Sequence, residues 1–188
     1  MAEPTDTKSG LAAIAAAASP APGRGLPPVH LWHPAHCGDI DIVIRRDGVW
    51  LHENSPIGRP ELVRLFSTVL RKDRDGYCLV TPVEKLAIRV EDLPFRAVVM
   101  TRAEGALRFT TDVGDVVEAG VDHPIRVETD PATGEPSPAL HVRADLWARI
   151  ARPVFYELVE MAGLEGDRLV VRSGGAAFDL GSTGVGAS

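Results

Sequence analysis

The stretch from residue 38 to residue 80, GDIDIVIRRDGVWLHENSPIGRPELVRLFSTVLRKDRDGYCLV, holds the pattern that decides the fold. Two apolar runs, Asp39–Ile44 and Val49–His52, flank an Asp-Gly pair, and this arrangement is typical of a β-hairpin. Pro60 suits the first turn of a helix whose apolar residues recur every three or four positions. A third run, Tyr77–Val80, completes a predicted strand–strand–helix–strand unit.

A later passage of the chain repeats this pattern. Two short strand-like runs, Ile125–Thr129 and Ala139–Arg143, flank a turn-rich segment and predict a second hairpin. We expect Asp145 to cap a helix that extends to Met161 and is kinked or restarted at Pro153, which has no backbone N–H. Two closing strands are predicted at residues 169–172 and 176–180.

The two helical passages align at their Arg-Pro pairs, Arg59-Pro60 and Arg152-Pro153, and the alignment superposes their apolar stripes. This match favours an internal duplication of one ββα-type unit. The alternative is chance agreement, because any two helices that face a core share the same period.

The ends of the chain differ in composition from its middle. Residues 1–28 hold eight alanines, five prolines and no aromatic side chain, so we predict a flexible N-terminal tail with a short alanine helix that docks or frays. Residues 181–188 form a second predicted tail. Between them we predict an α+β protein of two small domains, residues 29–84 and 85–180. Short alternating runs give the second domain a larger antiparallel meander: residues 86–90, 96–100, 107–111 and 116–119.

Composition excludes several classes of protein. With 188 residues, 45% of them hydrophobic, the chain can bury a core, and no apolar run approaches the roughly 18 residues of a membrane-spanning helix. The net charge of -6 argues against binding to bulk nucleic acid. Two cysteines cannot build a disulfide framework, which favours a reducing cytoplasm. We find no phosphate-loop, dinucleotide-binding or serine-hydrolase motif and expect no cofactor.

Charge is distributed unevenly along the chain. Residues 45–89 hold nine basic and six acidic side chains, whereas residues 90–135 hold four basic and ten acidic ones. A locally positive first domain suits a small anionic ligand better than it suits an acidic protein.

The loop before the first predicted helix has two interpretations. In the first, Asn54, Ser55 and Arg59 bind a phosphate or carboxylate group, since a helix start offers free N–H groups, and Arg64 joins them from the next turn. In the second, Asn54 or Ser55 caps the helix and Arg59 lies in water. Arg64 then pairs with a side chain of its own helix.

A polar stretch where the two predicted domains meet supplies further candidates. Thr81, Glu84 and Lys85 follow the third strand, and a domain junction is a preferred place for a ligand. The alternative is that Glu84 and Lys85 form an ordinary solvated pair. His123 begins the second hairpin, where it either faces the junction or makes one hydrogen bond in a loop.

A metal site is the least favoured hypothesis. The segment around residue 36 holds six potential ligands, but Pro34 and Gly38 break any helix that would gather them. Cys37 is a weak nucleophile candidate, whereas Cys78 lies within a strand and is expected in the core. We therefore expect no metal at these residues: His30, His33, His36, Cys37, Asp39 and Asp41.

Six sequence segments follow one another along the chain in this order: CGDIDIVI, SPIGRPELVRLFSTVLR, YCLVTPVEK, VEDLPF, HPIRVETD and RPVFYELVE. Together they resemble a bacterial family, domain of unknown function 1285, over residues 27–165. The resemblance implies two small duplicated domains, the second loosely like a pleckstrin-homology fold. It also implies a nucleotide-like ligand between the domains and a link to signalling, with no established activity. It places these candidate ligand residues near that interface: Asn54, Ser55, Arg59, Arg64, Thr81, Glu84, Lys85 and His123.

These observations favour a non-catalytic cytoplasmic protein that binds a small anionic, nucleotide-like ligand between its two domains and takes part in signal transduction. The first alternative is a hydrolase that uses Asp39, Asp41, His123 or a bound metal. The second is an adaptor for another protein, whose identity the sequence does not indicate.

Overall fold

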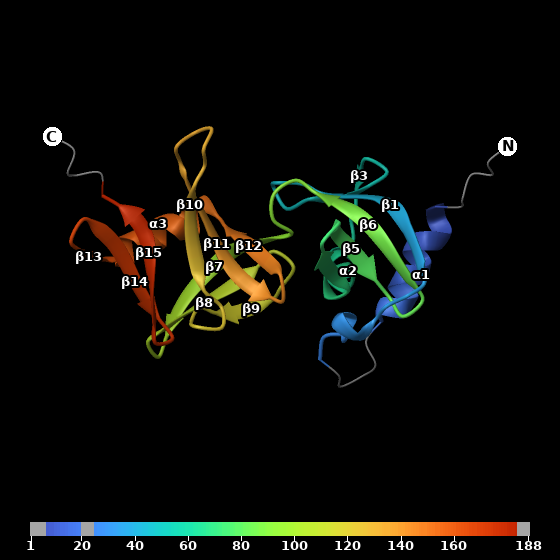
Figure 1. Cartoon of the computed structure of the whole chain (residues 1–188), viewed down its shortest axis with the longest axis horizontal. Helices are drawn as coiled ribbons and strands as arrows, with labels where there is room; N and C mark the ends of the chain where they lie inside the picture. Colours follow the sequence, from blue (N-terminus) through green and yellow to red (C-terminus); the bar gives the residue numbers. More distant parts are fainter. Residues whose placement is uncertain (1–6, 20–24, 184–188) are drawn as a thin grey trace. The chain divides into compact units, whose positions relative to one another are not determined.

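The computed structural model describes residues 7–19 and 25–183, and the chain divides into two units, Met1–Asp92 (unit 1) and Leu93–Ser188 (unit 2) (Figure 1). Each unit combines a β-sheet with at least one α-helix, so the predicted α+β class with two small domains is confirmed. None of the helices in the described ranges is long and apolar enough to cross a membrane.

Unit 1 is built on a six-stranded sheet with the order β3-β2-β1-β6-β5-β4. β1 and β2 form the predicted hairpin, and Gly48 turns the chain with a φ of 89°, which glycine adopts without strain. β1 and β6 pair in parallel, whereas the other neighbours pair antiparallel. The strands are β1 (His36–Ile44), β2 (Trp50–His52), β3 (Ser55–Pro56), β4 (Leu70–Asp73), β5 (Gly76–Val80) and β6 (Glu84–Val90).

Two helices complete unit 1. α2 (Pro60–Thr68) begins with Pro60 in its first turn, as predicted, and buries Phe66 completely. α1 (Thr7–Ala18) packs against α2 and buries Ile14 completely. The predicted alanine helix is therefore confirmed in its docking form, because Ile14 gives it an apolar side chain to bury, and only the description of this segment as a flexible tail is wrong. Residues 1–6 and 20–24 of the predicted tail lie outside the described residues.

The division between the units lies after Asp92 and not after residue 84, as predicted. The sequence analysis assigned β6 to the second domain, yet β6 pairs with β1 on one side and with β5 on the other. A strand with two neighbours in one sheet belongs to that sheet. The alternation of residues 86–90 indicates a strand but not the sheet that it joins.

The main sheet of unit 2 has the order β10-β11-β12-β7-β8-β9. β7, β8 and β9 form the predicted antiparallel meander, and β12 pairs with β7 in parallel. This larger curved sheet is loosely like that of a pleckstrin-homology domain (Figure 1). The strands are β7 (Phe95–Ala103), β8 (Ala106–Thr111), β9 (Val116–Glu118), β10 (Ile125–Thr129), β11 (Pro136–Arg143) and β12 (Leu146–Ile150).

The predicted helix from Asp145 to Met161 is wrong in its first half. Residues Leu146–Ile150 form a strand in which buried and half-buried side chains alternate with a period of two. α3 (Arg152–Met161) begins after this strand, with Pro153 in its first turn rather than at a kink. Asp145 consequently caps no helix.

α3 leads into a three-stranded antiparallel sheet of β13 (Gly163–Glu165), β14 (Arg168–Ser173) and β15 (Ala176–Ser182). The sequence predicts the last two strands but not β13, and β15 extends two residues into the predicted C-terminal tail, whose residues 184–188 lie outside the described ones. Ser173 fixes this small sheet to the main sheet of unit 2. Its Oγ accepts from the Leu107 N–H at 2.7 Å and donates to the Ala119 carbonyl at 2.7 Å.

Candidate functional site

Four of the predicted ligand residues lie around β3 and the start of α2, and all four are exposed. Asn54 adopts a left-handed backbone with a φ of 62°, Ser55 begins β3, and Arg59 precedes the first turn of α2. No side chain caps α2, so the alternative in which Asn54 or Ser55 caps it is wrong. Arg59 has an extended backbone just before α2, whereas Arg64 lies within the helix.

Thr81 and Glu84 are brought together by the turn between β5 and β6. The Thr81 side chain is completely buried, and its hydroxyl accepts from the backbone N–H of Glu84 at 3.1 Å and of Val83 at 3.4 Å. The same hydroxyl lies 3.3 Å from the Glu84 carbonyl, to which it donates. Thr81 therefore closes a turn, and its hydroxyl is already occupied.

Lys85 belongs to an ionic group that we call the Asp73 cluster: Arg71, Asp73 and Lys85. The Lys85 ammonium lies 3.0 Å from one Asp73 oxygen, and the Arg71 guanidinium binds both Asp73 oxygens at 2.7 and 2.9 Å. Arg71 also donates to the carbonyls of Val29 and Trp32, both at 2.8 Å. The cluster thus ties the segment before β1, which includes the 3-10 turn η1 (Val29–Leu31), to the sheet of unit 1.

The Asp73 cluster is electrostatically saturated. Hydrogen bonds from Arg71, and then from Lys85, lower the pKa of Asp73 to about 2, against the opposing effect of burial. Burial raises the pKa of the neighbouring Cys78 thiol to about 11, so this cysteine is a core residue, as predicted. Lys85 is therefore engaged within the protein rather than presented to a ligand.

The residues of the hydrolase and metal hypotheses are dispersed. Asp39 and Asp41 are exposed on β1, and Asp41 forms an ion pair with Arg89 at 3.3 Å. In the part of the chain that the structure describes, no three His, Cys, Asp or Glu side chains lie close enough to hold a metal ion together. Cys37 is exposed, and its thiol contacts the Pro34 carbonyl at 4.0 Å.

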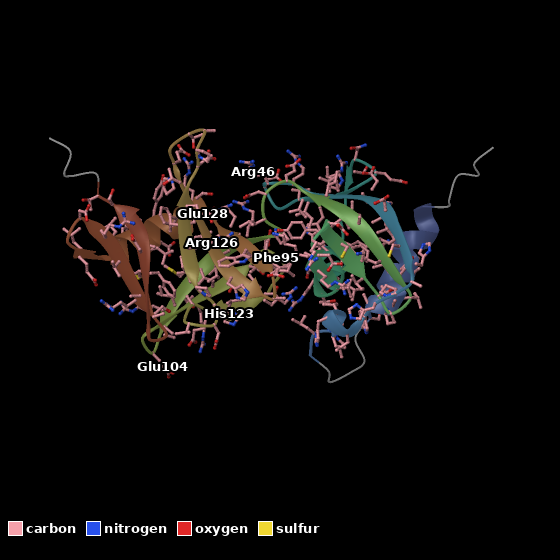
Figure 2. All side chains as sticks on the ribbon, viewed as in Figure 1. Arg46, Phe95, Glu104, His123, Arg126 and Glu128 are labelled. Atoms are coloured by element: carbon pink, nitrogen blue, oxygen red, sulfur yellow. The ribbon has the colours of Figure 1, made fainter. Side chains whose placement is uncertain are left out.

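His123 lies in unit 2, apart from the other seven candidates, in a row of rings beside β10. Its ring stacks on His141 at 5.5 Å between centroids, and His141 meets the edge of Trp147 at 5.2 Å. The Arg126 guanidinium lies over the Trp147 ring, 4.1 Å from its centroid, and Figure 2 shows Arg126 and Glu128 on β10 with His123 before its start. The two His141 ring nitrogens contact the carbonyls of Asp122 and Ala144, at 3.1 and 2.6 Å. The proposed meeting of His123 with the unit 1 candidates at the domain junction remains a prediction.

Sequence reasoning missed a surface pocket of unit 2, most of whose lining residues are exposed. Its volume is about 180 Å³, and it lies where the β7–β8 hairpin, the end of α3 and the small sheet meet. In Figure 2, Glu104 marks the tip of the β7–β8 hairpin, two positions beyond Arg102. We call this cavity the unit 2 pocket, and its lining residues are Arg102, Leu107, Met161, Gly163, Glu165, Val170, Val171 and Arg172.

Local geometry explains how two walls of the pocket are held together. Arg102 and Leu107 are cross-strand partners in the β7–β8 hairpin, and Ser173 Oγ holds the Leu107 N–H from the end of β14. Gly174 follows with a φ of 54°, and a Cβ atom there would lie 2.7 Å from the Ala119 carbonyl oxygen. Only glycine permits this close approach of the β14–β15 turn to the main sheet.

The pocket carries one uncompensated positive charge. The Arg172 guanidinium binds the Glu165 carboxylate at 2.7 Å, which neutralises both groups. Arg102 makes no hydrogen bond or ion pair with any other residue in the ranges 7–19 and 25–183. Its planar guanidinium is a suitable donor for a carboxylate or phosphate. No local sequence signal marks this site, because its charged residues come from positions 102, 165 and 172.

The two units, each with its own sheet and helix, define a two-domain α+β protein whose halves match the two domains of one sequence family. Residues 27–93 match the N-terminal domain of DUF1285, described as a domain of unknown function, and residues 94–180 match the DUF1285 C-terminal domain. The chain belongs to the DUF1285 family, as its resemblance implied. The matched ranges also place the domain boundary within one residue of the position that the structure shows.

Two crystal structures of DUF1285 family proteins are similar to this chain. One, from Silicibacter pomeroyi DSS-3, is 47% identical with a TM-score of 0.84, and the match covers 93% of this chain and 96% of that one. The other, from Shewanella baltica OS155, is 26% identical with a TM-score of 0.51, and covers 63% of this chain and 90% of that one. No curated protein matches the chain.

Proposed function

We propose that this protein is a binding module for a small anionic ligand, which the unit 2 pocket holds. The observation that carries the proposal is the Arg102 guanidinium, which lines a cavity of about 180 Å³ beside apolar side chains. An arginine without an internal partner gains most from a ligand, because no existing ion pair has to break first. The Asp73 cluster provides the contrast, since Arg71 and Lys85 are both already paired with Asp73.

Isothermal titration calorimetry of the full chain with a panel of carboxylates, phosphates and nucleotides tests the proposal. We expect at least one small anion to bind the natural protein and to lose affinity in Arg102→Gln. Arg108→Gln is the matched control, because Arg108 follows Leu107 on β8 and its side chain points to the opposite face, where it pairs with Glu118 at 3.3 Å. Equal binding by both variants, or no binding of any anion, contradicts the proposal.

A nucleotide-like ligand and a role in cytoplasmic signal transduction are the finer form of this proposal. They are supported by the family resemblance and by the locally basic sequence of residues 45–89. In unit 1, Arg59 and Arg64 make no ion pair within the described part of the chain and offer a second contact for an anion. If Arg59→Ala leaves nucleotide binding unchanged, this second contact is wrong.

A further inference from the structure

We infer that His141 is a proton-operated clamp in unit 2. In its doubly protonated form it joins the loop between β9 and β10, residues 119–124, to the turn between β11 and β12, residues 144–145. In its neutral form it releases the loop. The inference depends on no ligand and is separate from the proposed function. It rests on the contacts of the two ring nitrogens, on the neighbouring His123 ring and on the other contacts of the loop.

Both ring nitrogens of His141 lie against oxygen atoms that can only accept a hydrogen bond. Nδ1 is 3.1 Å from the Asp122 carbonyl oxygen, and Nε2 is 2.6 Å from the Ala144 carbonyl oxygen. A neutral imidazole carries one N–H, so it donates to one carbonyl and turns a lone pair toward the other. The imidazolium has an N–H on each nitrogen and donates to both. The geometry therefore favours the charged form of His141.

The ring of His123 does not compete for this proton. The two rings stack at 5.5 Å between centroids, so two imidazolium charges at these positions repel each other. His123 Nδ1 is buried and has no hydrogen-bond partner in the described part of the chain. A doubly protonated His123 would therefore bury an N–H without an acceptor, whereas both His141 nitrogens face one. The proton consequently belongs on His141.

The charged side chains on the elements around His141 are of both signs. Arg126 of β10 forms an ion pair with Glu128 at 3.5 Å. Arg143 of β11 forms an ion pair with Asp115 at 2.5 Å. Each guanidinium thus has a carboxylate beside it, which reduces its repulsion of a positive charge on the ring. The remaining charged side chains of the loop, the turn and β12 are Asp122, Asp145 and Arg149.

The loop is held at its two ends by contacts that involve no ionisable side chain. The N–H and the carbonyl of Ala119 are both hydrogen-bonded within unit 2, and the His141 backbone N–H donates to the Pro124 carbonyl at 3.0 Å. The ring contact holds the middle of the loop, at Asp122. Because the contact at Nε2 is the shorter one, the neutral ring keeps its proton toward Ala144 and turns its lone pair toward Asp122. Loss of one proton therefore loosens the middle of the loop.

NMR of the histidine ring N–H protons in the full chain tests the clamp directly. At about pH 5.5 we expect two slowly exchanging N–H protons on His141, because each is hydrogen-bonded, and at about pH 8 only the proton on Nε2. His36, an exposed histidine of β1, is the reference, and its ring protons should exchange too fast to be observed. Fewer than two such protons on His141 at the lower pH, or two at the higher pH, overturns the inference.

Amide hydrogen exchange tests the release of the loop. The Gly120 N–H donates to the His123 carbonyl within the loop at 3.1 Å. We expect its protection factor, corrected for the intrinsic exchange rate, to fall about fivefold between about pH 5.5 and about pH 8. The Gly134 N–H donates to the Asp130 carbonyl at 2.8 Å in the turn between β10 and β11 and serves as the internal control. Equal changes at the two amides contradict a release of this loop.

Two substitutions assign the response to one ring. His141→Gln removes the second ring N–H, so the Gly120 protection factor should be low at both pH values. His36→Gln is the matched control, because it removes an exposed strand histidine of unit 1, and it should leave the fivefold response intact. Persistence of the response in His141→Gln, or its loss in His36→Gln, overturns the role of His141. The NMR measurement on the natural protein remains decisive if His141→Gln does not fold.

Discussion

The Asp73 cluster of unit 1 and the pocket of unit 2 place arginines in opposite situations. Arg71 holds two carboxylate oxygens and two backbone carbonyls, so its donors are occupied. Arg102 lines a cavity and has no such partner in the described residues. The first arginine stabilises the fold, and the second is available to a ligand. Net charge along the sequence does not reveal this difference, because the more basic part of the chain contains the Asp73 cluster, whose cations are already paired.

The largest effect that we predict concerns the contact that shapes the unit 2 pocket. Gly174→Ala places a Cβ atom 2.7 Å from the Ala119 carbonyl oxygen and forces a left-handed backbone on alanine. We expect the free energy of unfolding to fall by about 3 kcal/mol, measured by chemical denaturation. Gly175→Ala is the matched control, since a Cβ atom there meets nothing within 4 Å, and it should cost about 1 kcal/mol. Equal losses in the two variants would show that the contact is unimportant.

The next effect concerns the saturated cluster. Asp73→Asn leaves the Arg71 and Lys85 cations without their carboxylate, and the three side chains are only 17%, 26% and 24% exposed for Arg71, Lys85 and Asp73. We expect a loss of about 2 kcal/mol at pH 7. Asp41→Asn, which breaks a mostly exposed ion pair with Arg89 in the same sheet, should cost less than about 0.5 kcal/mol. A loss no greater than this control contradicts the role of the cluster.

The pH dependence of stability tests the same contribution of Asp73. The folded pKa of Asp73 is lowered to about 2, so its contribution is fully present above the unfolded value near 4 and is lost as the pH falls from about 4 to 2. The difference in unfolding free energy between the natural protein and Asp73→Asn, up to about 2 kcal/mol at pH 7, should therefore shrink below pH 4. Denaturation curves at several pH values measure it. A difference that stays constant to pH 2 disagrees with this prediction.

The smallest effect concerns the available arginine. Arg102→Gln removes no internal ion pair from the described structure, so the free energy of unfolding should change by less than about 0.5 kcal/mol. Arg71→Gln, the same substitution in the saturated cluster, should cost about 2 kcal/mol. Thermal or chemical unfolding of the two variants side by side measures the contrast. If Arg102→Gln costs as much as Arg71→Gln, then Arg102 is structural and the comparison between the two regions fails.

Much of the fold is predictable from local pattern. The hairpin before α2, the Pro60 helix start and the meander of unit 2 all follow from periodicity and turn residues, which depend on near neighbours in the sequence. The first half of the predicted helix after Asp145 is wrong because Leu146–Ile150, read with the α3 residues, also fits a helical period. Pairing with β7 and β11 decides in favour of a strand.

The candidate site is much less predictable. The segments around Arg59 and Thr81 were recognised from their polar composition, but only tertiary contacts show that Thr81 closes a turn and that Lys85 is paired with Asp73. The pocket residues were not predicted at all. Arg102 and Glu165 are single charged residues in ordinary strands, and nothing in their local sequence separates them from other surface charges.

The amino-acid sequence by itself determined the two-domain α+β class, the family, and most strands and helices. These depend on short-range alternation, on turn residues and on the order of short sequence segments. The tertiary structure alone decided which sheet receives β6, which cations are paired and where a pocket forms. The physical reason is that an ion pair or a pocket is set by distances between atoms. Arg71 meets Lys85 through Asp73, and Arg102 meets Arg172 across a cavity, only once strands far apart in the chain have paired and packed.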